Sequence, residues 1–361
     1  MSSIPALINQ LIRPEILALN AYHVPVSAGM VKLDAMENPY LVPAALRAEI
    51  AAAVSDAAIN RYPDPSAQGV RQKIRELLQL NDDIDVLLGN GSDELIQLLA
   101  MAVNQPNAVL LSVEPSFVMY KMIATFLGMR YVGVPLAPDF SLDVPAMLEA
   151  IERDQPALIF LAYPNNPTAN SFVATDIKKI IAAAPGLVVV DEAYYAFAED
   201  SFVAHLADYP NLLVMRTFSK LGMAGLRLGF LVGDKRWLAQ LDKLRLPYNV
   251  GVLPQLVATK LLEHQHLLLA QAAQIKLDRS KLAQQLGVIT SVQVFASSAN
   301  FLLLRVARAS EIFAGLKQRG VLIKNLHGSH AMLENCLRVT IGTPEENECF
   351  LAAFKESLLQ Q

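Results

Sequence analysis

The chain has 361 residues, of which 53% are hydrophobic and 18% are charged, and its 30 Lys and Arg against 34 Asp and Glu give a formal net charge of −4. This length can bury a large core and suggests two or three domains, while the hydrophobic content excludes an intrinsically disordered chain. The slight acidic excess argues against a nucleic-acid-binding surface. Two cysteines, Cys336 and Cys349, are too few for a disulfide framework, so we expect a reducing, cytoplasmic location.

The N-terminus and the longest uncharged stretch give no sign of secretion or membrane insertion. Residues 1–20 lack the basic start and the small-residue cleavage site of a signal peptide. The stretch 95–113 is interrupted by Asn104, Pro106 and Asn107, which favours a helix, a turn and a strand over a membrane span.

From about residue 85, short apolar runs alternate with longer stretches of helical periodicity, a pattern typical of βαβ units and a parallel sheet. Several of the runs are continuously apolar, as expected for strands buried on both faces. We therefore predict an α/β domain with a mostly parallel central sheet. The predicted strands are 85–88, 108–112, 130–135, 157–161, 187–190, 212–216 and 228–232, and the predicted helices are 92–103, 117–127, 144–152 and 175–183.

After Pro254 the pattern changes to that of a smaller α+β unit. It predicts a long helix over 256–286, a strand at 300–306, a helix at 310–319 and strands at 320–324 and 336–341. Residues 1–45 show no sheet of their own and are expected to complete this unit. The expected division is a large domain over 46–265 and a small domain made of 1–45 and 266–361.

Four of the predicted strands end in polar clusters, at 89–94, 163–168, 191–194 and 217–220. Because the carboxyl ends of parallel strands meet at one edge of a sheet, we expect these clusters to converge. Gly91 and Ser92 open a helix whose free N–H groups could bind a phosphate, although a capped turn has the same sequence. Asp191 follows three valines, so it is either a buried carboxylate that needs a cation or a solvated strand end. Lys220 lies among small residues, and nearby Arg227 is expected to lower its pKa.

Taken together, these clusters resemble the fold type I pyridoxal-phosphate (PLP) aminotransferases of classes I and II over nearly the whole chain. The spacing of Asn166, Asp191 and Lys220 fits that family, and Ser219-Lys220 followed by Arg227 is its lysine signature. Within the family the chain is most similar to the histidinol-phosphate aminotransferases. The segments that carry the closer similarity are 37–40, 60–64, 89–94, 226–229 and 337–343.

The resemblance implies a PLP site. Lys220 would bind the cofactor covalently and move the substrate proton, Asp191 would pair with the pyridine nitrogen, and Tyr194 would act on the ring oxygen beside Asn166. Tyr62 would reach the phosphate of the partner subunit, so a homodimer is expected. The cofactor-binding residues implied are Lys220, Gly91, Ser92, Asp93, Phe117, Asn166, Asp191, Tyr194, Ser219, Arg227 and Tyr62.

The resemblance also implies substrate residues and a reaction. Arg338, whose planar guanidinium suits a carboxylate or a phosphate, would bind the substrate together with Tyr22 and Asn38. The implied reaction converts L-histidinol phosphate and 2-oxoglutarate into imidazole acetol phosphate and glutamate in histidine biosynthesis. One departure is Ala169, which stands where the family has a glycine and tolerates a positive φ poorly. The six histidines have no metal-ligand spacing, so no metal is expected.

Two other enzyme functions remain open on the same residues. The chain could be an aminotransferase for aromatic or other amino acids, or a PLP-dependent phospho-amino-acid decarboxylase, because all of these share one scaffold. A transcription regulator with an aminotransferase-like domain is disfavoured, since only about 45 residues with few basic ones precede the strand–helix pattern.

Overall fold

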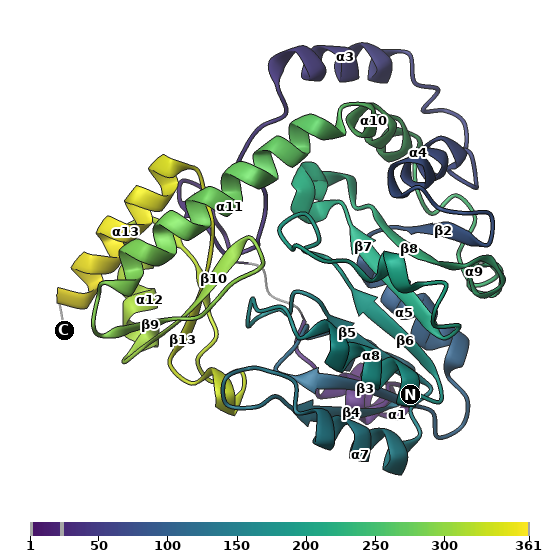
Figure 1. Ribbon diagram of the computed structural model, residues 1–361, viewed down its shortest axis with the longest axis horizontal. Coiled ribbons are helices and arrows are strands. Elements are labelled where there is room, and N and C mark those ends of the chain that lie inside the picture. The colour runs from purple at the N-terminus through teal and green to yellow at the C-terminus, as the bar shows by residue number, and fades with distance from the viewer. Residues whose placement is uncertain (1–2, 22–24, 360–361) are drawn as a thin grey trace.

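The computed structural model describes residues 3–21 and 25–359, and its largest element is a seven-stranded sheet. The strand order is β2-β8-β7-β6-β5-β3-β4, and of these strands β8 alone runs antiparallel to its neighbours, so the predicted mostly parallel sheet is confirmed (Figure 1). The strands are β2 (Ile84–Gly89), β3 (Val109–Glu114), β4 (Arg130–Pro135), β5 (Leu158–Ala162), β6 (Leu187–Asp191), β7 (Leu212–Thr217) and β8 (Gly229–Asp234).

Helices cover both faces of this sheet, which explains its continuously apolar strands. In β6, Leu187 and Val189 pack into one hydrophobic layer, whereas Val188 and Val190 pack into the layer on the other face. The first face is covered by α5 (Ser92–Val103), α6 (Met119–Leu127) and α9 (Lys235–Leu241), and the second by α4 (Gln68–Leu78), α7 (Val144–Asp154) and α8 (Ala174–Ala183).

A smaller antiparallel sheet of order β12-β13-β10-β9 lies beside the large one. The helices α12 (Ala309–Gln318) and α13 (Pro344–Leu359) pack against each other beside it. The long helix α11 (Gln265–Gly287) runs from the region of the large sheet to the smaller one (Figure 1). The strands of the smaller sheet are β9 (Val292–Val294), β10 (Phe301–Val306), β12 (Lys324–Asn325) and β13 (Cys336–Thr340).

The N-terminal segment reaches the smaller region through one short strand. Strand β1 (Val31–Lys32) pairs in parallel with β11 (Val321–Leu322). The domain boundaries at 45/46 and 265/266 stay a prediction. The remaining elements are α1 (Ile4–Leu11), α2 (Pro14–Leu17), α3 (Ala44–Ser55), α10 (Val252–Glu263) and the short turns η1 (Phe202–His205), η2 (Ser219–Met223), η3 (Ala224–Leu226) and η4 (Ala331–Leu333).

Two sequence predictions were wrong in the C-terminal part. The helix expected over 256–286 is interrupted at His264, where φ is −113° and ψ is 30°, and the His264 ring lies 3.3 Å from the Glu49 carboxylate on α3. The strand expected over 320–324 is divided between β11 and β12, which belong to different sheets. Neither the break at His264 nor the change of sheet after Leu322 is marked by a Gly or Pro at that point of the sequence.

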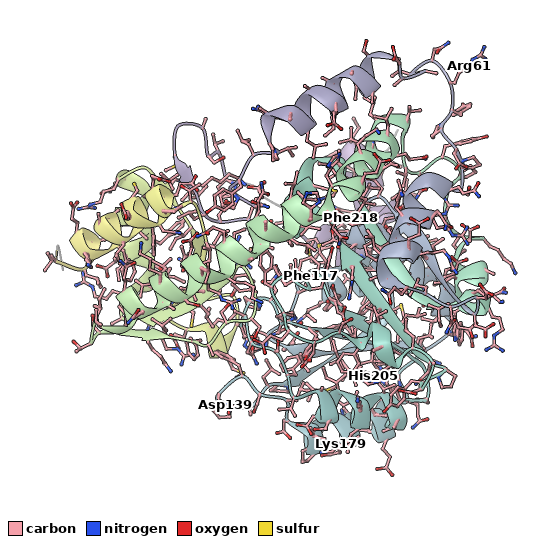
Figure 2. All side chains as sticks on the ribbon, turned by 45° about the horizontal axis from the view of Figure 1, so that its top comes forward. Arg61, Phe117, Asp139, Lys179, His205 and Phe218 are labelled. Atoms are coloured by element: carbon pink, nitrogen blue, oxygen red, sulfur yellow. The ribbon has the colours of Figure 1, made fainter. Side chains whose placement is uncertain are left out.

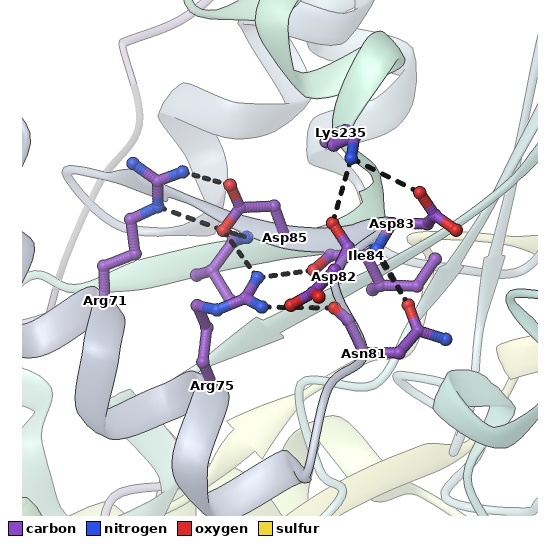
Figure 3. Close-up of polar contacts among 9 residues, drawn as sticks. Arg71, Arg75, Asn81, Asp82, Asp83, Ile84, Asp85 and Lys235 are labelled. Atoms are coloured by element: carbon purple, nitrogen blue, oxygen red, sulfur yellow. Dashed lines mark hydrogen bonds and ion pairs between the residues drawn. The ribbon is translucent and has the colours of Figure 1, made fainter.

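A cluster of charged side chains fixes α4 on the outer strand of the large sheet (Figure 3). Arg71 Nε and Arg75 Nη1 each donate to Asp85 Oδ1 of β2 at 3.1 Å. Burial opposes the charge on Asp85, but these guanidinium groups hold its pKa below the usual value. Lys235 at the start of α9 pairs with Asp83 at 3.3 Å. The cluster therefore anchors the beginning of β2, whose other end opens into the candidate site.

No helix in the ranges 3–21 and 25–359 is long and apolar enough to span a membrane.

Candidate active site

The carboxyl ends of the central strands surround a cavity of about 110 Å³. Figure 2 places Phe117 and Phe218, which belong to this edge, near the middle of the molecule, with Asp139 and Lys179 at its periphery. The four polar clusters singled out in the sequence all contribute to this one cavity. Its lining residues are Met36, Ser92, Asp93, Phe117, Ala162, Pro164, Asn166, Asp191, Ala193, Tyr194, Thr217, Ser219, Lys220 and Arg227.

Lys220 brings an amine to this cavity from the turn after β7. The turn is irregular because Gly222 has a φ of 119° inside it, and the Lys220 Nζ donates to the backbone oxygen of Ala35 at 3.1 Å. Removal from water lowers the pKa of Lys220 to about 8, and the positive charge of Arg338 adds to this effect. The lowered pKa agrees with the expectation, but burial is its main cause, and Arg227 contributes little.

Asp191 is a buried carboxylate at the last position of β6, with 3% of its surface exposed. Its Oδ2 accepts a hydrogen bond from the hydroxyl of Tyr120 at 2.6 Å, and its Oδ1 accepts one from the backbone N–H of Ala193 at 3.1 Å. Burial raises the pKa of Asp191 to about 6. No Lys or Arg in the described part of the chain forms an ion pair with it. The carboxylate faces the cavity, where a bound cation could pair with it.

The backbone of Gly91 and Ser92 and the guanidinium of Arg227 enclose a small space at the start of α5, which we call the cup. Gly91 has a φ of 82°, and a Cβ added there would lie 2.8 Å from Arg227 Nη2, while a Cβ on Gly229 would lie 2.6 Å from the Ser92 nitrogen. Arg227 also pairs with Asp93 at 3.4 Å. A helix N-terminus and an arginine directed at one small space are the groups that bind a phosphate.

Ser219 stands at the edge of the same cup. Its backbone N–H donates to the Thr217 hydroxyl at 3.1 Å, and its own hydroxyl accepts from Thr217 Oγ1 at 2.9 Å. These hydrogen bonds fix the turn between β7 and Lys220, and they thereby fix the position of the Lys220 amine relative to the cup.

The loop after β5 presents Asn166 to the cavity. Asn166 Oδ1 accepts a hydrogen bond from Arg338 Nη1 at 2.6 Å, which leaves the amide N–H₂ group as a donor. Ala169 has a φ of 69° and is fully buried, so the loop takes the left-handed conformation despite the Cβ. Backbone bonds from Ala169 N to Asn165 O and from Ser298 N to Ala169 O, at 2.9 and 2.8 Å, hold it there.

Two aromatic side chains, Tyr194 and Phe117, line the cavity. Tyr194 is buried, packs edge-on against Phe301 with ring centroids 5.3 Å apart, and has its pKa raised by burial. Phe117 packs edge-on against Tyr120 at 5.6 Å. Both rings are held by neighbours in the core, which suits them to contact a flat ligand.

A second cavity, of about 410 Å³, shares Met36, Phe117 and Asn166 with the first. Arg338 lines it from β13, and Lys324 lies directly opposite Arg338 in the register of β12 and β13. The other polar residues of its wall include Lys121, Glu114 and His330. Arg338 is buried and donates from Nη2 to the backbone oxygen of Asp34 at 3.0 Å. The second cavity is therefore rich in cations and lies next to Lys220 and Asp191.

Two sequence-predicted residues, Tyr62 and Asn38, do not line these cavities. Tyr62 is 80% exposed and stacks on Tyr248 with ring centroids 4.5 Å apart. Asn38 uses its amide N–H₂ to bridge the backbone oxygen of Leu221 and the side chain of Gln271, at 3.2 and 3.0 Å, and so lies behind the turn that carries Lys220. Tyr22 falls outside the described residues. The roles expected for these three residues stay predictions.

Sequence reasoning missed two residues of the site, Tyr120 and Lys324. Tyr120 follows Phe117 by three positions, a helical spacing that could place it beside Phe117 but gave no sign of its contact with Asp191. Lys324 gave no signal either, because its position beside Arg338 depends on strand register.

Among residues 3–21 and 25–359, no three His, Cys, Asp or Glu side chains lie close enough to hold a metal ion.

Comparison with known proteins decides the family. The family model described as aminotransferase class I and II matches residues 28–354. This chain belongs to that family. The resemblance seen in the four polar clusters is thereby confirmed.

The relatives of this aminotransferase narrow the similarity further. It is 54% identical over 359 residues to histidinol-phosphate aminotransferase 2 of Cupriavidus pinatubonensis, with 98% of each chain covered. It is 50% identical over 348 residues to the histidinol-phosphate aminotransferase of Chromobacterium violaceum, with 96% of this chain and 98% of the relative covered. The crystal structure of histidinol-phosphate aminotransferase from Sinorhizobium meliloti in complex with pyridoxal-5'-phosphate matches with a TM-score of 0.86 at 23% identity, over 97% of this chain and 98% of the other, which supports the fold.

Proposed function

We propose that this aminotransferase uses PLP to convert L-histidinol phosphate and 2-oxoglutarate into 3-(imidazol-4-yl)-2-oxopropyl phosphate and L-glutamate, a step of histidine biosynthesis. One observation carries the proposal: the amine of the half-buried Lys220 and the buried carboxylate of Asp191 line one cavity, and this cavity adjoins a second one lined by Arg338 and Lys324. The names and near-complete coverage of relatives that are 54% and 50% identical support it.

The residues present fit PLP group by group. Asp191 forms no ion pair with a Lys or Arg among the described residues and would pair with the protonated ring nitrogen. Lys220 would hold the cofactor through a covalent bond between Nζ and its aldehyde, and the cup made by Ser92 and Arg227 would hold its phosphate. When bound, PLP supplies an electron-withdrawing ring that makes the proton on the substrate α-carbon acidic.

Lys220 is suited to proton transfer once its amine is free. A pKa of about 8 allows the amine both to accept and to return a proton near neutral pH. A surface lysine with an ordinary pKa of about 10.4 would be almost fully protonated under the same conditions.

The cation-rich cavity is suited to the acidic end of the substrate. The Arg338 guanidinium is a planar fork that fits a carboxylate or a phosphate, and Lys324 adds a second positive charge at the opposite register position. A phosphate carries nearly two negative charges at neutral pH, so it gains more from two cations than a carboxylate does. This arrangement favours a phosphorylated amine in one half of the reaction and still accepts a dicarboxylic acid in the other.

The proposal includes a homodimer. Tyr62 and Tyr248 form an exposed stacked pair, and Ile59 and Leu246 nearby are 76% and 72% exposed. An apolar surface of this kind is typical of a protein contact, which supports the homodimer, and the family resemblance assigns Tyr62 to the phosphate of the partner subunit. The cytoplasmic location expected from the sequence stays a prediction.

A half-reaction screen tests the function. The PLP form is mixed in turn with histidinol phosphate, glutamate, aromatic amino acids, aspartate and phosphothreonine, and the loss of the cofactor's visible absorbance is followed. We expect histidinol phosphate and glutamate to react fastest. Faster reaction of an aromatic amino acid would replace the proposed substrate, and an amine product formed with release of CO₂ would replace amino transfer by decarboxylation.

A further inference from the structure

Tyr120 makes the shortest side-chain contact to the carboxylate proposed to hold the cofactor. Its hydroxyl donates to Asp191 Oδ2 at 2.6 Å, whereas the other carboxylate oxygen receives a backbone N–H at 3.1 Å. Tyr120 is not among the residues that line the cofactor cavity. It therefore stands behind Asp191, on the side away from the ligand.

The position of the Tyr120 hydroxyl is fixed by packing. The side chain is fully buried on α6, and its ring stacks on Phe160 of β5 with centroids 4.6 Å apart and planes 5° apart. The rings of Tyr120 and Phe117 are nearly perpendicular, with centroids 5.6 Å apart. A side chain held on two sides by aromatic rings loses little further freedom when it makes a hydrogen bond, so the contact to Asp191 has a defined direction.

The charges that face Asp191 make this hydrogen bond important. Burial works against the charged form of the carboxylate, and the like charges of Asp93 and Glu192 add to that effect. Lys220 and Arg227 line the same cavity, but neither forms an ion pair with Asp191. The groups that favour its charged form through hydrogen bonds are the Tyr120 hydroxyl and the Ala193 N–H.

Tyr120 is also a dependable donor. Burial and the neighbouring carboxylate raise its pKa well above the usual value, so the hydroxyl keeps its proton across the whole physiological range. The hydrogen bond therefore persists at every pH at which the enzyme would work.

We propose that Tyr120 is a positioning residue that keeps Asp191 ionised and directed at the ring nitrogen of PLP. This inference rests on the proposed function, since it assigns Asp191 the cationic ring nitrogen as its partner. Because the Tyr120 ring packs against Phe117, it also fixes the position of Phe117, which is expected to stack on the PLP ring. Loss of the hydroxyl makes the carboxylate easier to protonate and weakens its hold on the ring nitrogen.

The test compares Tyr120→Phe with the unchanged protein in PLP binding to the cofactor-free form, measured by visible absorbance from pH 6 to 9. Phenylalanine keeps the stack on Phe160 and removes the hydroxyl alone. A hydrogen bond to a charged group corresponds to roughly tenfold in affinity or more, so we expect a loss of that size at neutral pH. We also expect the loss to grow as the pH falls, because the carboxylate of the variant takes up its proton at a higher pH.

A PLP analogue in which C–H replaces the ring nitrogen separates positioning from packing. The analogue has no ring cation for Asp191, so Tyr120→Phe should leave its affinity unchanged. In an Asp191→Asn background the hydroxyl should likewise lose its effect on PLP binding, because residues that act through one another are not additive. Tyr195→Phe is the matched control, since it removes a hydroxyl next to the site from a ring that stacks on Arg216 instead.

Each outcome has one meaning. Unchanged PLP affinity and unchanged pH dependence in Tyr120→Phe overturn the inference, and so does an equal loss for PLP and for the analogue, which would assign Tyr120 to packing alone. If the unchanged protein binds no PLP at all, the proposed function fails instead. Should the single variant not fold, the comparison of Asp191→Asn with and without Tyr120→Phe at matched stability decides in its place.

Discussion

The side chains that carry the chemistry are held in an environment that opposes their charges. Burial raises the pKa of Asp191 to about 6 and lowers that of Lys220 to about 8. Both shifts favour the neutral forms, so the cofactor-free protein keeps two ionisable groups at some cost to its stability. Such pairs of perturbed groups in one cavity are typical of active sites.

This cost can be measured at Asp191. Because its pKa is raised on folding, the stability it contributes is complete below its ordinary pKa near 3.8 and is lost as the pH rises through about 6. A shift of that size corresponds to about 2–3 kcal/mol at pH 8. We therefore expect Asp191→Asn to make the cofactor-free protein more stable by about that amount at pH 8, with the gain vanishing near pH 4.

Urea unfolding at a series of pH values checks this expectation. Asp82→Asn, at an exposed position beside the Lys235 amine, is the control and should change little. If Asp191→Asn destabilises the cofactor-free protein at pH 8, the carboxylate is not held against its charge as described.

The sequence predicted those site residues whose chemical type and place at the end of a strand both indicate a catalytic role. A carboxylate after three valines and a lysine between a strand and small residues were predicted to meet, and they line one cavity. Tyr120 was not predicted, because a tyrosine within an apolar helix is normally a core residue, and only the fold brings it to Asp191. Tyr62 was assigned through the resemblance alone, and its position in a single chain does not test that role.

At the scale of the elements, the site depends on the close approach of β8 and α5. Gly229 opens β8, and its Cα faces the first backbone nitrogen of α5, so that a Cβ there would lie 2.6 Å from Ser92 N and 2.8 Å from the carbonyl carbon of Gly91. Backbone atoms in a paired sheet and a helix start cannot move apart cheaply. The spacing of these two elements therefore requires glycine.

We expect Gly229→Ala to displace the phosphate cup. The overpacking should cost about 1–3 kcal/mol of stability, and PLP affinity should fall at least tenfold. Thermal unfolding and PLP titration provide the two measurements. Gly287→Ala, where a Cβ would meet nothing within 4 Å, is the control, and a Gly229→Ala protein that binds PLP normally would refute the role of this contact.

A second prediction at this scale concerns Lys324, which the register of β12 and β13 places opposite Arg338. Replacing it with methionine removes a charge opposite Arg338 and keeps the length of the side chain. We expect KM for histidinol phosphate to rise about tenfold and KM for glutamate to change less, because a phosphate carries nearly two negative charges and a carboxylate carries one. Lys179→Met, at an exposed position of α8, is the control, and equal changes for both substrates would contradict the assignment of Lys324 to the phosphate.

The elements were predicted unequally well, for a physical reason. The buried strands came within one or two residues of their observed ends, because a strand covered on both faces leaves a continuous apolar run. The break at His264 and the division of 320–324 between two sheets were missed, because both depend on contacts with distant segments. Local patterns specify what is buried, but they do not specify which partner buries it.

At the scale of the whole molecule, the cofactor cavity lies in the large sheet region, whereas Arg338 comes from the smaller sheet and joins it through Asn166. The site therefore requires both regions to be in place. In the proposed homodimer, Tyr62, which is exposed and stacked on Tyr248, would add a residue to the site of the partner subunit.

Mixed dimers test this shared site. A Lys220→Ala chain lacks the amine and a Tyr62→Ala chain lacks the tyrosine, so a dimer of the two should contain one complete site. Random mixing should give about a quarter of the unchanged activity, although the first parent is inactive and the second is impaired. Activity that does not rise above the average of the separate parents would show that Tyr62 serves its own chain or no site.

The claim on which the rest depends is that the Lys220 amine is the one that binds PLP. The most direct measurement adds PLP to the cofactor-free protein, reduces the product with borohydride, and locates the added mass by peptide analysis. We predict one label per chain, on Lys220, and a loss of this label together with the visible absorbance in Lys220→Ala. A label spread over surface lysines, or one concentrated on a lysine other than Lys220, would contradict the account.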